Sequence, residues 1–219
     1  MSKLVVLEYV SLDGVIQGPG HAGEDPAGGF AHGGWTGPFI SQHPHFVGES
    51  FAAADGFLFG RLTYEIFAAF WPTVTDPGDP IAQALNTRPK YVAAASLPDP
   101  AWAGTTVLDG DVADQVATLK ARTGRELLVV GSGQLAQGLA DHGLVDEYRL
   151  LVHPIVVGSG KKLFRDGAAL TPMRLVEAMV STGGLVFLTY RPDPGHIAGG
   201  AGAEDAIAFA RACRNRTEG

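Results

Sequence analysis

The chain has one cysteine in 219 residues, no lysine- or arginine-rich run, and no apolar run longer than a strand. Cys213 cannot form an internal disulfide, and its place in a polar C-terminal segment argues against a nucleophile. The formal net charge of −7 at pH 7 argues against nucleic acid as the main partner, because no basic run is present to neutralise phosphates. Without a signal-peptide pattern or a spanning segment, we expect a cytoplasmic protein that does not bind a membrane.

Metal ligands are also scarce. His21, His32, His43 and His45 gather in one segment, but they lack the spacing of a helical metal site. No cysteine and no close set of carboxylates completes a coordination shell around them. We therefore expect solvent-facing loop histidines and no bound metal.

Glycine, in contrast, is abundant. Eight of the 30 glycines fall in residues 17–38, a segment with little apolar content. A loop of this length in a compact domain is usually a lid, a binding loop or disordered. Trp35 lies in it, and two interpretations remain open: it pins the loop onto the core, or it stacks on a ligand.

Two segments have the pattern strand, glycine turn, helix. Residues 127–140 begin as a buried strand, break at Gly131-Ser132-Gly133 and continue with helical spacing. Residues 55–60 form a short buried strand, followed by a helix with Arg61 and Thr63 in its first turn. The free N–H groups of such a turn form a seat for phosphate, although a turn can also be glycine-rich only because it is tight. Two such turns in one domain favour a nucleotide.

The remaining elements alternate along the chain. Lys3–Val10 is predicted as a central strand, and Asp13-Gly14 marks a turn at its end, where Asp13 caps the turn or contacts a ligand. Further strands are predicted at 90–95, 105–108 and 146–153, with a hairpin at 174–181 and 185–191. Helices are predicted at 46–54, 61–67, 81–86 and 111–122, the last with Asp111 near its N-cap and Gly124 at its end.

This order predicts an α/β fold with a mixed, mostly parallel sheet, flanking helices and an antiparallel C-terminal edge. Residues 1–192 are predicted to form one domain, because no shift in composition divides them. Residues 193–219 read as a glycine-rich linker with one Ala-rich helix, a flexible tail or one that docks on a subunit.

Four segments together resemble a known family. They are Ser11-Leu-Asp-Gly-Val15, Leu58-Phe-Gly-Arg-Leu-Thr-Tyr-Glu65, Val129-Val-Gly-Ser-Gly-Gln-Leu135 and the segment from Gly143 to Phe164. The chain resembles the stand-alone form of the C-terminal reductase domain of the bifunctional deaminase-reductase of riboflavin biosynthesis. That resemblance implies a dihydrofolate-reductase-like fold over nearly all of residues 3–191. The deaminase half is absent, since no His-x-Glu and Cys-x-x-Cys zinc signature is present.

The resemblance also implies a cofactor site, NADPH in the first place. It assigns the phosphate contacts to residues of the two glycine turns, namely Gly60, Arg61, Thr63 and Tyr64, and Gly131, Ser132, Gly133, Gln134 and Leu135. Gly14, Val15 and Ile16 would lie along the nicotinamide. Family members often carry a Ser-Arg pair for the 2′-phosphate after the strand that begins at Lys90. This chain has Ala94 and Ala95, with Ser96 just beyond, so NADH or a flavin is an open alternative.

The resulting hypothesis is an NAD(P)H-dependent reductase of a small, flat heteroaromatic substrate, pterin- or pyrimidine-like by resemblance. Trp35 would cover the substrate. Asp13, Glu49 and His153 are candidates for proton donation or substrate hydrogen bonding, each with a structural alternative as turn residue, helix-surface residue and strand-end residue. The alternative is a flavin- or deazaflavin-binding or non-catalytic binding protein with the same fold. We also expect a homodimer.

Overall fold

The computed structural model describes residues 1–42, 44–97, 100–122 and 124–195, without the side chains of residues 44 and 45. The sequence expectations for residues 196–219 lie outside the described residues. The strands are β1 (Lys3–Ser11), β2 (Gly56–Gly60), β3 (Lys90–Ala93), β4 (Thr105–Leu108), β5 (Glu126–Val130), β6 (Glu147–His153), β7 (Met173–Val180) and β8 (Val186–Pro192). The helices are α1 (Pro44–Ala53), α2 (Arg61–Phe70), α3 (Pro80–Thr87), α4 (Val112–Ala121) and α5 (Gly133–Asp141).

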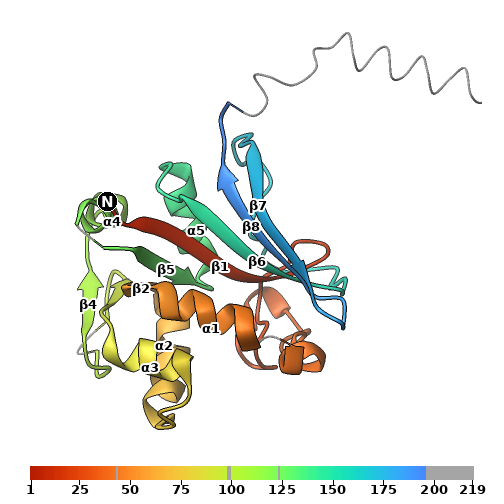
Figure 1. Cartoon of the computed structure of the whole chain (residues 1–219), viewed down its shortest axis with the longest axis horizontal. Coiled ribbons are helices and arrows are strands. Elements are labelled where there is room, and N and C mark those ends of the chain that lie inside the picture. Colours follow the sequence, from red (N-terminus) through yellow and green to blue (C-terminus); the bar gives the residue numbers. More distant parts are fainter. Residues whose placement is uncertain (43, 98–99, 123, 196–219) are drawn as a thin grey trace, which may run out of the picture.

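All eight strands form one sheet in the order β4-β3-β2-β5-β1-β6-β8-β7, which Figure 1 shows as a twisted layer with helices on its faces. The pairs from β4 to β6 are parallel, while β8 runs antiparallel to both β6 and β7. The predicted fold class, including the antiparallel C-terminal edge, is confirmed. The strand predicted at 90–95 is shorter, because pairing with β2 and β4 stops at Ala93.

The centre of the sheet is β1, whose side chains alternate between two apolar layers. Val5 and Leu7 face a core built with α1, α2 and α3, whereas Leu4 and Val6 face a second core built with α4 and α5. Burial of each such side chain contributes about 1.5–3 kcal/mol, so a strand buried on both faces fixes the register of its neighbours.

The N-termini of the helices differ in whether a side chain caps them. Asp79 caps α3 by accepting hydrogen bonds from the N–H groups of Ile81 and Ala82, and Asp111 caps α4 through the N–H of Asp114. In α2 and α5 no side chain caps the N-terminus among the described residues. The predicted end of α4 at Gly124 is too late, since the helix ends at Ala121 and Arg122 is already extended.

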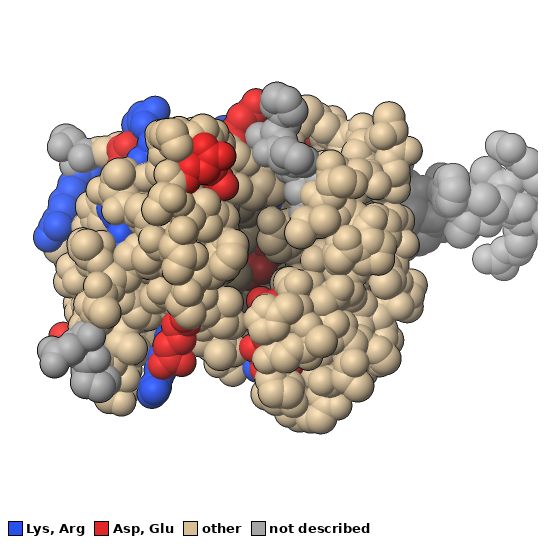
Figure 2. Space-filling view, turned by 90° about the horizontal axis from the view of Figure 1, so that it is seen from below, with Lys and Arg blue, Asp and Glu red and all other residues tan. Residues whose placement is uncertain are grey.

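Because the strands from β4 to β6 are parallel, their carboxyl ends meet at one edge of the sheet. Register pairs Ser11 with His153, and Gly60 with Ala93. The segments singled out in the sequence after β1, β2, β3 and β5 therefore leave the sheet at the same edge. Seen from the side of α2 and α3, the surface is hollowed near its middle, and acidic side chains lie deep in the hollow (Figure 2).

Candidate functional site: two glycine turns at the carboxyl edge of the sheet

The two glycine turns are tied together by Ser132. Its hydroxyl accepts a hydrogen bond from the N–H of Gly60 at 2.9 Å and donates one to the carbonyl of Val130 at 3.1 Å. To do so Ser132 takes a left-handed backbone conformation with φ 60°, the one non-glycine residue in the described ranges with a positive φ. Such strain persists where the surroundings fix it, and it is frequent at ligand sites.

The starts of α2 and α5 flank this bridge. Gly131 has φ 54°, and a Cβ on it would lie 3.4 Å from the hydroxyl oxygen of Thr63 on α2. The first-turn N–H groups of both helices lack a side-chain cap, and each helix dipole adds partial positive charge there. Two uncapped helix ends held side by side can bind two linked anionic groups, such as a pyrophosphate.

The other residues predicted to contact phosphate differ in whether their side chains are free to reach a ligand. Arg61 is exposed and paired with Glu65 at 2.7 Å, a surface pair that contributes little and leaves the guanidinium able to reorient. Tyr64 is only 3% exposed, and its hydroxyl lies 3.3 Å from that of Thr105, so its side chain belongs to the core. Ser96 is exposed just beyond β3, and Gln134 is exposed on α5.

Asp13 stands in the turn after β1 and accepts hydrogen bonds from three donors. These are the hydroxyl of Ser11 at 2.6 Å and the N–H groups of Val157 at 3.0 Å and Gly158 at 2.7 Å. The Ser11 hydrogen bond first, and then the Val157 one, lower the pKa of Asp13 to about 2. The residue is therefore an ionised acceptor that joins the β1 turn to the segment after β6.

The rest of that turn reaches α5. Gly14 has φ 85°, Val15 is fully buried, and a Cβ on Gly133 would run into the end of the Ile16 side chain. Ile16 thus lies directly over the start of α5. Three of the predicted segments, 13–16, 60–64 and 131–135, are brought together at one edge.

The loop after β1 is folded onto the core by two side chains. Trp35 is 6% exposed, and its indole N–H donates to the carbonyl of Gln17 at 2.8 Å. Gln17 in turn donates to the carbonyls of Asp25 and Ala27 and accepts from the N–H of Lys161. This geometry fits a side chain that pins the loop, while stacking of Trp35 on a ligand remains a proposal.

His153 lies beneath this loop at the end of β6, with no exposed surface. One ring nitrogen is 2.9 Å from the carbonyl of Leu151, and its ring makes edge contacts with Tyr9, Trp35 and Phe39. Of the remaining loop histidines, His21 and His32 are exposed, and the side chains of residues 43 and 45 are outside those described.

Glu49 is not at this edge. It is exposed on α1 and lines a groove of about 330 Å³ with Lys3 and Arg191. Lys3 begins β1, whereas the glycine turns lie beyond the other end of the strand, so the structure does not bring Glu49 together with those turns.

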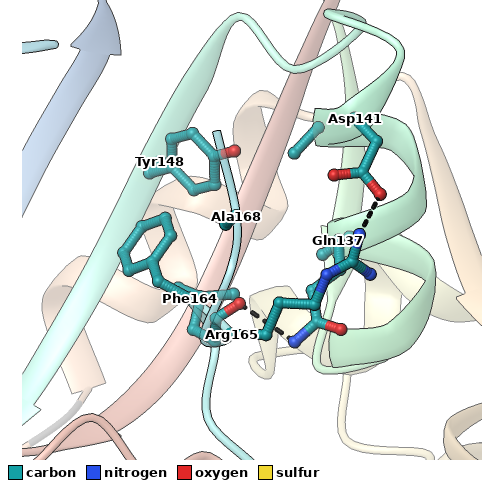
Figure 3. Close-up of a pocket in the computed structure, with 9 residues that line it drawn as sticks. Gln137, Asp141, Tyr148, Phe164, Arg165 and Ala168 are labelled. Carbon is teal, nitrogen blue, oxygen red and sulfur yellow. Dashed lines mark hydrogen bonds and ion pairs between the residues drawn. The ribbon is translucent and has the colours of Figure 1, made fainter. Parts of the chain in front are cut away.

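A second cavity, drawn in Figure 3, is too small for a ligand. It has a volume of about 40 Å³, room for no more than a few water molecules. An ion pair between Arg165 and Asp141 and a hydrogen bond from Gln137 to the carbonyl of Leu163 cross it. These contacts fasten the segment around residue 164 to α5, so the cavity is part of the packing.

One residue of the edge is absent from the sequence predictions. Glu8 of β1 is 3% exposed, and its Oε1 is buried without a hydrogen-bond partner among the described residues. The sequence does carry a signal for Glu8, because it is the one acidic residue in a mostly apolar strand segment from Lys3 to Val10. Gln17, which organises the loop, had no such signal.

Comparison with known proteins identifies the family of the chain. The model of the family described as the RibD C-terminal domain matches residues 2–187. The protein YyaP of Bacillus subtilis (strain 168) is 26% identical over 195 residues, covering 86% of this chain and 94% of its own.

Two solved structures share the fold. A protein from Shewanella sp. PV-4 named for riboflavin biosynthesis has a TM-score of 0.60 at 21% identity, covering 87% of this chain and 99% of its own. Dihydrofolate reductase from Enterococcus faecalis, solved with NADP(H), has a TM-score of 0.54 at 16% identity, covering 87% and 96%. At these identities the likeness establishes the dihydrofolate-reductase-like fold.

Proposed function

Because the chain belongs to the RibD C-terminal domain family, we propose that it is an NAD(P)H-dependent reductase of a small, flat heteroaromatic substrate, pterin- or pyrimidine-like. The observation that carries this proposal is the pair of uncapped helix starts joined through Ser132. They suit the two phosphates of a dinucleotide, and the dihydrofolate reductase of the same fold was solved with NADP(H).

In this proposal the chain's own residues bind and orient. The first-turn N–H groups of α2 and α5 hold the pyrophosphate, with Arg61 and Thr63 beside it. The bound dihydronicotinamide supplies the hydride. Residues 14–16 line its ring, and the loop pinned by Trp35 and Gln17 excludes water from the substrate.

The three candidates for proton donation differ in protonation, burial and position. Asp13 is ionised near neutral pH, since its pKa is about 2. It can therefore accept a hydrogen bond from a substrate N–H group but holds no proton to donate. His153 is buried under Trp35 and would act on a substrate only after the loop moves. Glu49 stays a candidate only if the substrate reaches α1.

The choice of cofactor depends on the segment after β3. Ala94 and Ala95 provide no guanidinium for a 2′-phosphate, and Ser96 is the exposed polar side chain there. NADPH binding therefore relies on Ser96 and on reorientation of Arg61. The same absence of a guanidinium is what favours the alternative, a flavin- or deazaflavin-binding protein that uses the same edge of the sheet.

Thermal unfolding in the presence of NADPH, NADH, FMN and a deazaflavin tests the proposal. A nicotinamide dinucleotide at 100 times its Kd is expected to stabilise the fold by about 2.7 kcal/mol, which raises Tm by about 5–10 °C in a chain of this size. A rise with FMN or the deazaflavin alone would replace the reductase proposal with the alternative. Consumption of NAD(P)H absorbance with pterin and pyrimidine substrates then tests catalysis.

The location, oligomeric state and partners of the protein are part of the same proposal. Within the described ranges, every helix is too short or too polar to cross a bilayer. We propose a cytoplasmic homodimer whose partners are small molecules rather than nucleic acid or membranes, in line with the net charge of −7.

A further inference from the structure

Glu8 is the one acidic residue of β1, and its side chain faces an apolar layer. It is 3% exposed, and the residues two positions before and after it, Val6 and Val10, belong to the core covered by α4 and α5. Side chains of a strand alternate between faces, so Glu8 shares the face of these two valines. Its register partner on β6 is Leu150, which belongs to the same core.

On its other side Glu8 borders the glycine turn. The pairing of β1 with β5 ends at Leu7 and Val130, and the N–H of Gly131 donates to the carbonyl of Leu7 at 3.2 Å. One further step in register sets Glu8 level with Gly131, about 4.8 Å away in the sheet direction. Gly131 has no side chain, so nothing on that residue separates Glu8 from the turn that starts α5.

The carboxyl group is left with an unmet hydrogen-bonding capacity. Its Oε1 is buried and has no partner among the described residues. Such a group costs folding free energy, and its presence in a native protein calls for a reason. Burial, and then the nearby charge of Glu24, raise the pKa of Glu8 well above its usual value. This shift favours the protonated form of the carboxyl group, which can donate a hydrogen bond.

We propose that Glu8 is a ligand-binding residue whose buried carboxyl group donates a hydrogen bond to a carbonyl oxygen or ring nitrogen of the cofactor's flat ring system. This inference rests on the proposed function, because the glycine turns must first hold the phosphates. Glu8 lies on β1 beside the end of β5, and β1 leads directly into the 13–16 segment, where the ring would follow the pyrophosphate.

Two replacements separate a binding role from a packing role. Glu8→Leu removes the buried polar group, so it is expected to raise Tm by about 2–4 °C. The same variant is expected to bind the cofactor about tenfold more weakly, because one buried hydrogen bond is lost. Glu8→Gln keeps an N–H donor and is expected to retain affinity within about threefold. Isothermal titration with NADPH, NADH and FMN supplies the Kd values.

Glu126→Leu is the matched control. Glu126 also has a buried oxygen without a partner, Oε2, but it begins β5 at the opposite end of the strand and pairs with Arg149 at 2.9 Å. Its replacement is expected to lower Tm and to leave Kd unchanged.

The outcomes distinguish the two proposals. If the wild type binds a probe and Glu8→Leu binds it equally well, the role of Glu8 is refuted while the proposed function stands. If Glu8→Gln loses as much affinity as Glu8→Leu, hydrogen-bond donation is refuted. If the wild type binds none of the three probes, the proposed function fails, and the role of Glu8 fails with it.

Discussion

Asp13 acts as a hydrogen-bond acceptor that joins two parts of the chain more than 140 positions apart in sequence. Asp13→Ala leaves the N–H groups of Val157 and Gly158 without their acceptor. We expect a loss of about 1–3 kcal/mol in the free energy of unfolding, measured by urea denaturation at pH 7. Asp13→Asn keeps one acceptor oxygen and is expected to lose less. Equal losses in both variants would contradict this account.

The same residue contributes to acid sensitivity. Its pKa is about 2 in the folded chain against an ordinary 3.8. The folded pKa is depressed, so its stabilisation is complete above pH 3.8 and is lost as the pH falls toward 2. We expect Asp13→Asn to show a shallower fall in stability than the wild type between about pH 4 and 2. If the wild type and Asp13→Asn lose stability equally over this pH range, Asp13 does not contribute to the acid sensitivity.

At the scale of single elements, the left-handed backbone of Ser132 costs free energy, and the hydrogen bond of its side chain offsets that cost. Ser132→Ala loses the hydroxyl that accepts from Gly60 and keeps the left-handed backbone, so we expect it to lower stability by about 1–2 kcal/mol. Ser132→Gly loses the same hydroxyl but adopts φ 60° without strain, and it should be about 1 kcal/mol more stable than Ser132→Ala. Chemical denaturation of both variants measures the difference, and its absence would argue that the turn is unstrained.

The start of α5 offers a matched pair of glycines. Gly133→Ala places a Cβ against Ile16, and we expect it to lower stability by about 1–3 kcal/mol and to weaken cofactor binding. Gly138 lies in the same helix with open space around its Cβ position. Gly138→Ala should raise stability by up to about 1 kcal/mol and leave Kd unchanged. Weakened binding in Gly138→Ala would mean that the binding effect is not local to the turn.

The elements themselves were largely predictable, because β1, β2 and β5 are apolar runs that end in glycine or in an Asp-Gly turn. Their ends could be placed at one edge from parallel pairing alone. The sequence could not reveal that Ser132 joins the two turns, since a serine between glycines has the same pattern whether it bonds or not. It also did not predict that Tyr64 turns into the core beside Trp102, because an aromatic in a first helical turn suits both directions.

Glu49 and Glu8 illustrate the limit for site residues. Glu49 was a candidate because it is a carboxylate near a helix start, yet only the path of α1 decides which end of β1 it reaches. The sequence predictions treat Glu8 only as part of a strand, although an acid in a buried strand is the stronger signal. An ionisable side chain at a position where burial disfavours its charge is more informative than one on a helix surface.

At the scale of the whole molecule, β7 is the last strand of the sheet, and no strand among the described residues pairs with its outer edge. Leu175, Val176, Met179 and Val180 are 40–72% exposed on it, and exposed apolar side chains on an edge strand are of the kind that a second copy covers. From the expected homodimer we predict that the double variant Val176→Lys and Val180→Lys sediments as a monomer, with an unchanged circular dichroism spectrum. A wild type that sediments as a monomer at tens of micromolar would refute the dimer.

The position of β5 in the sheet also constrains how the molecule forms. This strand begins at residue 126, yet it lies between β1 and β2, which are finished by residue 60. The middle of the sheet therefore stays open until more than half of the chain has left the ribosome. Non-local pairing of this kind slows folding toward the millisecond-to-second range. The two glycine turns meet only when β5 inserts, so the capacity to bind a dinucleotide should arise late, together with the sheet itself.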